Sequence, residues 1–161
     1  MDAIELLRGQ HEVVKALFSK LEKAGDDAKQ ELFEQIADAL AVHAAIEERH
    51  FYPATKSART ADLLQEAAEE HLAAKRIIAD LLEMPPEDPQ FDAKVSVLKE
   101  DVEHHVEEEE NDLFPKVRKM LKKDELEDLG MVMEDTAEAL KASGASRERV
   151  PAETGAAAPL E

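Results

Sequence analysis

Two stretches of the chain repeat each other: HAAIEERHFYP over residues 43–53 and HVEEEENDLFP over residues 105–115. In both, glutamates stand four and five residues after the first histidine, an aromatic residue stands nine after it and a proline ten after it. Residues four apart lie on the same face of a helix, so each stretch presents an imidazole and a carboxylate to one side. These pairs are His43 with Glu47 and His105 with Glu109.

A second, shorter pair of stretches precedes the first. HEVVK over residues 11–15 matches HLAAK over residues 71–75. From His11 to His71 is 60 residues, and from His43 to His105 is 62 residues. The two offsets are nearly equal, so one helical hairpin is predicted to occur twice in the chain.

Apolar residues recur three or four positions apart along four segments, which is the spacing of one inward-facing helix stripe. The segments run from about residue 2 to 24, 26 to 53, 60 to 82 and 88 to 115. The chain has only 5 Gly in 161 residues, which favours helices over β-turns. Because the links are short, neighbouring helices are expected to be antiparallel. The sequence predicts an all-α protein with an up-down-up-down four-helix bundle over residues 1–122.

Beyond this bundle we expect one more helix and an unstructured end. Residues 123–141 have the pattern of an amphipathic helix capped by Asp124, which is expected to dock on the bundle or on a second copy of the chain as a homodimer. Thr60 and Asp88 are the expected caps of the third and fourth helices. Residues 142–161 lack periodicity and bulky apolar residues, so they are predicted to be a disordered tail.

Composition excludes several classes of function. The chain carries 38 Asp and Glu against 20 Lys and Arg, a formal net charge of −18, so nucleic acid and anionic membrane surfaces are not expected partners. It has no cysteine, which excludes disulfides, iron–sulfur clusters and thiolate nucleophiles. No apolar run is long enough for a membrane span, and the start lacks a signal-peptide pattern. We expect a cytoplasmic protein.

Six polar residues occupy inward stripe positions, where burial costs free energy unless a partner satisfies them. They are His11, His43, Glu47, His71, His105 and Glu109. One interpretation is a set of core histidines hydrogen-bonded to acids without a metal. The other is a binuclear metal site, because carboxylates can bridge two cations and imidazole with carboxylate suits iron, manganese or zinc.

A count of ligands favours the metal interpretation. Four imidazoles and two bridging carboxylates fill about eight of the twelve positions of two octahedra, and a bridging oxide or hydroxide takes two more. About one position per metal then stays open for dioxygen, peroxide or another small ligand. A ferritin-like site instead needs two Glu-x-x-His motifs, and only Glu47 with His50 forms one.

The pattern of His11, His43-x3-Glu47, His71 and His105-x3-Glu109 resembles the hemerythrin-like, or HHE cation-binding, domain over roughly residues 1–120. The resemblance implies an antiparallel four-helix bundle around two non-haem iron ions with an oxo or hydroxo bridge. It also implies that the two glutamates bridge the irons and that the four histidines are terminal ligands. Oxygen carriers of that family have His-x3-His on the third helix, whereas here Lys75 stands four residues after His71, in place of the second histidine.

Three functions follow from this resemblance. The leading hypothesis is a protein that binds or senses a small ligand such as dioxygen, peroxide or nitric oxide. The second is an enzyme that decomposes peroxide at the same centre, and the third is an iron-sensing or iron-storage module. No catalytic group outside the metal cluster is evident.

Neighbouring polar residues are expected to have structural or solvated roles. His50 is expected at a helix end in water, with ligation of the metal as the alternative, and His104 on a solvated face. Tyr52 is expected to pack, with ligation of iron as the alternative, and Lys75 to extend its amine toward solvent. The acidic run Glu107, Glu108 and Glu110 is expected to be a solvated face.

Overall fold

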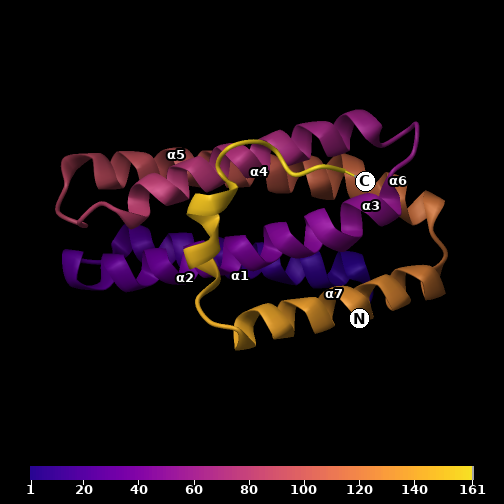
Figure 1. Cartoon of the computed structure of the whole chain (residues 1–161), viewed down its shortest axis with the longest axis horizontal. Helices are drawn as coiled ribbons and strands as arrows, with labels where there is room; N and C mark the ends of the chain where they lie inside the picture. The colour runs from indigo at the N-terminus through magenta and orange to yellow at the C-terminus, as the bar shows by residue number, and fades with distance from the viewer. Residues whose placement is uncertain (161) are drawn as a thin grey trace.

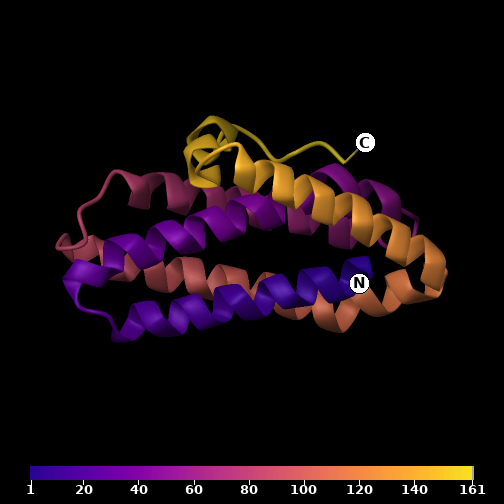
Figure 2. The same cartoon turned by 90° about the horizontal axis from the view of Figure 1, so that it is seen from below.

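The computed structural model describes residues 1–160, and this part of the chain is helical without a strand (Figure 1). The prediction of an all-helical protein is therefore confirmed. Four long helices lie side by side along the long axis, and a fifth long helix packs against the first two (Figures 1 and 2). They are α1 (Ala3–Lys23), α2 (Asp26–Ile46), α4 (Ala61–Leu82), α5 (Pro89–Glu108) and α7 (Lys123–Ala142). Within the described residues, none of these helices is apolar enough over its length to cross a membrane.

The capping residues expected from the sequence agree only in part with the observed helix starts. Asp88 caps α5 as expected, because its carboxylate accepts from the backbone N–H of Gln90. Thr60 stands at the N-cap of α4 as expected, but its side chain makes no capping hydrogen bond, because its hydroxyl donates to the carbonyl of Thr55, 2.7 Å away. Asp124 lies inside α7 rather than capping it, since the helix already begins at Lys123.

Each of the two repeated stretches contains a wider π turn that the apolar pattern did not predict. These turns are η1 (Glu47–Phe51) and η2 (Glu109–Leu113), followed by the short helices α3 (Tyr52–Thr55) and α6 (Phe114–Met120). In η1 the backbone N–H of Tyr52 donates to the carbonyl of Glu47, five residues back. The helix therefore continues past Pro53, where a regular α-helix would be disrupted. The π turn η1 also places the side chain of Tyr52 in the core, with its hydroxyl next to Glu47.

The hydrophobic core has two parts, with the polar stripe residues at their boundary. On α1, Ile4 and Leu7 belong to one cluster and Val14 and Phe18 to the other, with His11 between them. The same order holds on α4, where His71 lies between the two clusters. Apolar packing on both sides therefore excludes bulk water from the plane of the histidines.

The expectation of a disordered tail over residues 142–161 needs correction for residues 142–160, and residue 161 lies outside the described part of the chain. Ser146–Glu153 forms a 3₁₀ helix, η3, which packs against α2 and α4, and Val150 is buried in that contact. Arg147 donates from its backbone N–H and its guanidinium to the carboxylate of Asp38, at 2.8 and 2.9 Å. One buried side chain and a carboxylate that accepts from both the backbone and the guanidinium of Arg147 stabilise a segment too short to show a periodic pattern.

Gly130 decides how closely α7 approaches the N-terminus. A Cβ at this position would lie 2.5 Å from the carbonyl oxygen of Met1 and 2.8 Å from the backbone nitrogen of Ala3. We expect Gly130→Ala to lower the free energy of unfolding by about 1–3 kcal/mol through overpacking, measured by urea denaturation. Gly9→Ala is the matched control, because nothing lies within 4 Å of its added Cβ, and it is expected to be roughly 0.5–1 kcal/mol more stable. Equal midpoints for both variants would contradict the close approach.

Candidate metal centre

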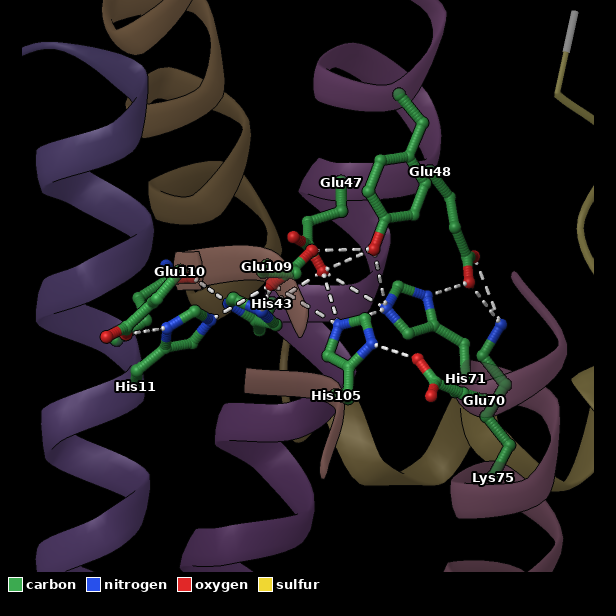
Figure 3. Close-up of polar contacts among 12 residues, drawn as sticks. His11, His43, Glu47, Glu48, Glu70, His71, Lys75, His105, Glu109 and Glu110 are labelled. Atoms are coloured by element: carbon green, nitrogen blue, oxygen red, sulfur yellow. Dashed lines mark hydrogen bonds and ion pairs between the residues drawn. The ribbon is translucent and has the colours of Figure 1, made fainter. Parts of the chain in front are cut away.

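The six residues singled out from the sequence come together in the interior (Figure 3). Each of the four long helices α1, α2, α4 and α5 contributes one histidine, and each π turn contributes one glutamate at its first residue. All six are nearly inaccessible to water. They are His11, His43, His71, His105, Glu47 and Glu109.

The two carboxylates lie between the imidazoles. Oε1 of Glu109 is 3.1 Å from Nε2 of His11 and 3.3 Å from Nε2 of His105. Oε1 of Glu47 is 3.1 Å from Nε2 of His43 and 3.0 Å from Nε2 of His71. Each glutamate therefore approaches histidines from two helices, as a shared ligand would.

Several of these atoms lack the partners that a metal-free polar cluster needs. Nε2 of His43 makes no hydrogen bond although Glu47 lies close to it, and Oε2 of Glu47 is also without a hydrogen-bond partner. The Nε2 atoms of His71 and His105 face each other at 3.3 Å. Buried polar atoms left in this state are costly, and a cation shared by these nitrogens and oxygens would satisfy them. The donor set therefore fits metal ions better than a hydrogen-bonded core.

A second ring of residues orients the histidines. Each of the four histidines of the centre directs Nε2 inward and forms a hydrogen bond between Nδ1 and a side-chain oxygen (Figure 3). The Nδ1 partners are Glu110 for His11 at 2.6 Å, Gln10 for His43 at 2.7 Å, Glu48 for His71 at 2.8 Å and Glu70 for His105 at 2.9 Å. An oxygen acceptor keeps the proton on Nδ1 and leaves the lone pair on Nε2 for a metal.

These orienting residues were not recognised in the sequence, and Glu110 was expected on a solvated face. The repeat did contain a signal for these residues. A polar residue, Gln10 or Glu70, stands directly before His11 and before His71, and a second glutamate, Glu48 or Glu110, stands directly after Glu47 and after Glu109. The sequence pattern did not show that each would reach a histidine on a neighbouring helix.

Removing one orienting carboxylate tests this ring. We expect Glu110→Ala to weaken metal binding by about 10–100-fold, because Nδ1 of His11 loses its acceptor and the ring can rotate. Glu107→Ala removes an exposed acid from the same run and is expected to leave the affinity unchanged. Competition against a chromophoric chelator measures both affinities. If the two variants bound metal equally, the orienting role would be wrong.

Two further side chains differ from the expectations for them. The hydroxyl of Tyr52 does not merely pack, because it lies 2.8 Å from Oε2 of Glu109 and 3.1 Å from Oε1 of Glu47. Lys75 does not extend into solvent. Its amine is buried and bonds both carboxylate oxygens of Glu48 at 3.0 Å, and Glu48 in turn accepts from His71.

The remaining histidines lie outside the centre. Nε2 of His50 is 2.7 Å from the hydroxyl of Thr136 on α7, so the residue is at a helix contact rather than in water. His104 is exposed, as expected, and lies near the carboxylates of Glu70 and Glu108. Neither residue points at the ligand atoms of Glu47 and Glu109.

The histidines and glutamates of the cluster shift one another's pKa values. Burial lowers the pKa of His43, but the carboxylates of Glu47 and Glu109 raise it further, to about 9. Burial and Glu109 raise the pKa of Glu47, yet His43 and His105 outweigh them and set it to about 2. The carboxylates of Glu47 and Glu109 thus favour the protonated form of His43, whose charge balances theirs in part when no metal is bound. A metal cation would take over that balance and release protons.

Comparison with known proteins agrees with this site. A model of the hemerythrin HHE cation binding domain matches residues 2–117. A protein of Nostoc sp. named DNA nickase is 33% identical over 128 residues, which cover 79% of this chain but only 36% of that protein. An uncharacterized protein of Mycobacterium tuberculosis is 30% identical over 146 residues, 89% of each chain.

A solved structure is also similar. The crystal structure of an HHE cation binding domain-containing protein from Mycobacterium kansasii superposes with a TM-score of 0.80 at 27% identity. The match covers 93% of this chain and 99% of that one. The family model spans most of the sequence, and the ligand atoms of four of the buried residues, His43, Glu47, His105 and Glu109, lie close enough together to hold a metal ion, so this chain belongs to the hemerythrin HHE cation-binding domain family.

Proposed function

We propose that the buried cluster holds two non-haem iron ions and that the protein binds or senses a small ligand there. The observation that carries this proposal is the set of six buried ligand side chains, with hydrogen-bond partners missing at His43 and Glu47. Imidazole and carboxylate without thiolate suit iron in this setting, and the family match supports the same chemistry.

The chain supplies the positions for both ions through an antiparallel up-down-up-down bundle. In this proposal His11, His43, His71 and His105 are terminal ligands, and the carboxylates of Glu47 and Glu109 are shared, with an oxo or hydroxo bridge completing the pair. When bound, the two irons supply open coordination positions and reversible redox chemistry. The four oxygen acceptors on Nδ1 keep the rings oriented while ligands exchange.

An apolar cavity supports a small ligand as the partner. It has a volume of about 40 Å³ and lies beside all four histidines. Its wall is largely hydrophobic, with residues such as Val14, Leu40, Ile78 and Val102. Such a wall offers water few hydrogen-bond partners, whereas dioxygen and nitric oxide need none.

Peroxide decomposition is the second candidate, and the hydroxyl of Tyr52 favours it. This buried hydroxyl holds a proton against Oε2 of Glu109, 2.8 Å away, inside the ligand cluster. Burial and the carboxylates of Glu109 and Glu47 raise the pKa of Tyr52 well above its ordinary value, so the proton is retained. Tyr52 therefore keeps a hydroxyl proton within the cluster, which a polar ligand would accept in place of Glu109.

Metal analysis with an optical spectrum of the aerobically purified protein tests the proposal. We expect about two irons per chain and near-ultraviolet absorption of a bridged pair. A spectral change with nitric oxide or dioxygen would support ligand binding. Sustained oxygen release from hydrogen peroxide, reduced in Tyr52→Phe, would support the enzyme instead. Absence of iron after reconstitution with ferrous iron would return the cluster to a structural role.

A further inference from the structure

The repeated hairpin creates two related grooves beside the histidines, and the chain treats them differently. One groove lies between α2 and α4, and the other between α1 and α5. Residues 146–160, which we call the strap, follow α7, and their 3₁₀ helix η3 contacts both α2 and α4 across the first groove. Figures 1 and 2 show the path of the strap over these two helices. The inference below concerns access to the same centre and rests on the proposed function.

The strap is attached to both walls of its groove. On α2 the guanidinium of Arg147 bonds Asp38 at 2.9 Å. On α4 the amine of Lys75 pairs with Glu153 at 3.1 Å, and Arg76 donates to the carbonyl of Thr154 at 3.0 Å. Between these attachments the side chain of Val150 is 2% exposed and forms part of the cavity wall beside the histidines. The strap therefore closes the cavity on the α2 and α4 side.

The groove between α1 and α5 is open. It has a volume of about 330 Å³ and reaches inward to His11 and Glu110. Residues of its floor also line the apolar cavity, so the two spaces adjoin. The shared residues are His11, Val14, Val102 and Val106.

The repeat keeps only part of the strap's attachment in the other groove, where Lys15 and Glu100 stand at the positions of Lys75 and Asp38. At the repeat position of Arg76, which holds the strap on α4, α1 has Ala16. At the position of Glu34, which lies 3.4 Å from Arg147, α5 has Ser96. Two of the side chains that hold the strap are thus absent from the other groove.

We propose that access to the metal centre is one-sided: the strap seals the groove between α2 and α4, and small ligands enter between α1 and α5 past Val106. The ligand class is small and apolar, since three of the four residues that line both spaces are valines. The route ends at His11 and Glu110, the histidine and orienting glutamate of that side. The Lys75–Glu48–His71 chain on the other side is covered by the strap.

Xenon exchange tests the route without using activity, because xenon enters apolar cavities. The full chain is measured by xenon NMR both metal-free and loaded with zinc, a diamagnetic cation that imidazole and carboxylate also bind. We expect Val106→Phe to slow exchange by about tenfold or more. Glu103→Trp covers the groove mouth from an exposed position and is expected to slow exchange even if phenylalanine at 106 disturbs packing. Glu148→Ala, on the exposed face of the strap, is the control and is expected to change nothing.

The double variant distinguishes the two grooves. Val150→Ala opens the strap side, so Val106→Phe combined with Val150→Ala is expected to regain fast exchange. The inference is overturned if xenon does not enter the cavity, or if both groove variants exchange as fast as the unaltered chain. Failure of the proposed function would appear separately, as a lack of bound iron in metal analysis. On iron-loaded protein, Val106→Phe should slow the association of nitric oxide while leaving the iron content unchanged.

Discussion

Glu109→Ala is expected to reduce the iron content from about two ions per chain to one or fewer, the largest effect expected of any single substitution. The carboxylate of Glu109 approaches three imidazoles, with Oε1 at 3.1 Å from His11, 3.3 Å from His105 and 3.8 Å from His43. In the proposed centre of two ions, its loss would remove a shared ligand and leave the repulsion between the ions less compensated. Glu47→Ala is expected to behave alike, because Glu47 lies close to histidines of α2 and α4.

His104→Ala and His50→Ala are the controls for this result. Both remove an imidazole near the centre in sequence, but His104 is exposed and His50 contacts Thr136 on α7. Both variants are expected to keep the full iron content in plasma emission analysis. If the two glutamate variants kept the same full iron content as the two histidine variants, the ligand assignment would be wrong. Far-ultraviolet circular dichroism on each variant separates loss of metal from loss of fold.

Metal removal is expected to have the second largest effect, on stability. Without a cation the centre buries four histidines and two glutamates whose polar atoms are incompletely paired. A ligand that binds only the folded state raises the free energy of unfolding by about 4 kcal/mol when its free concentration is 1,000 times its Kd. For a chain of this size that corresponds to a rise in Tm of roughly 8–16 °C.

Thermal unfolding followed by circular dichroism measures this shift, with and without a chelator. Glu109→Ala is the matched control, and metal should raise its Tm by much less. An equal shift in that variant would mean that the metal stabilises the protein at another place. Extensive loss of helix in the metal-free protein at room temperature would favour the iron-sensing hypothesis, because folding would then depend on the metal.

Local regularity explains why the sequence predicted the helices and the six central residues. A histidine and a glutamate four positions apart share a helix face whatever surrounds them, so His43 with Glu47 and His105 with Glu109 were recognisable from spacing alone. The repeat then identified His11 and His71 as their partners on the other helices. The starts of the long helices also followed, within a few residues, from glycine, proline and capping residues, whereas α2 and α5 end at Ile46 and Glu108, seven residues before the predicted ends, because the π turns begin there.

The features that the sequence did not predict depend on contacts between distant segments. Glu110 belongs to an acidic run, and only the register of α5 against α1 brings it to His11. Lys75 became a buried residue because Glu48 and the strap surround its amine. The strap itself has no periodic pattern, and its order comes from Val150 and from ion pairs to α2 and α4.

By itself, therefore, the sequence determined the helical class, the hairpin repeat and the inward placement of six candidate ligands, because these depend on spacing within single helices. Only the tertiary structure decided which oxygen orients each histidine, that the hydroxyl of Tyr52 lies among the ligand atoms, and which groove is open. Those outcomes depend on the register between helices and on where the strap docks. Packing of the whole chain sets both, and the residue pattern of any one segment does not.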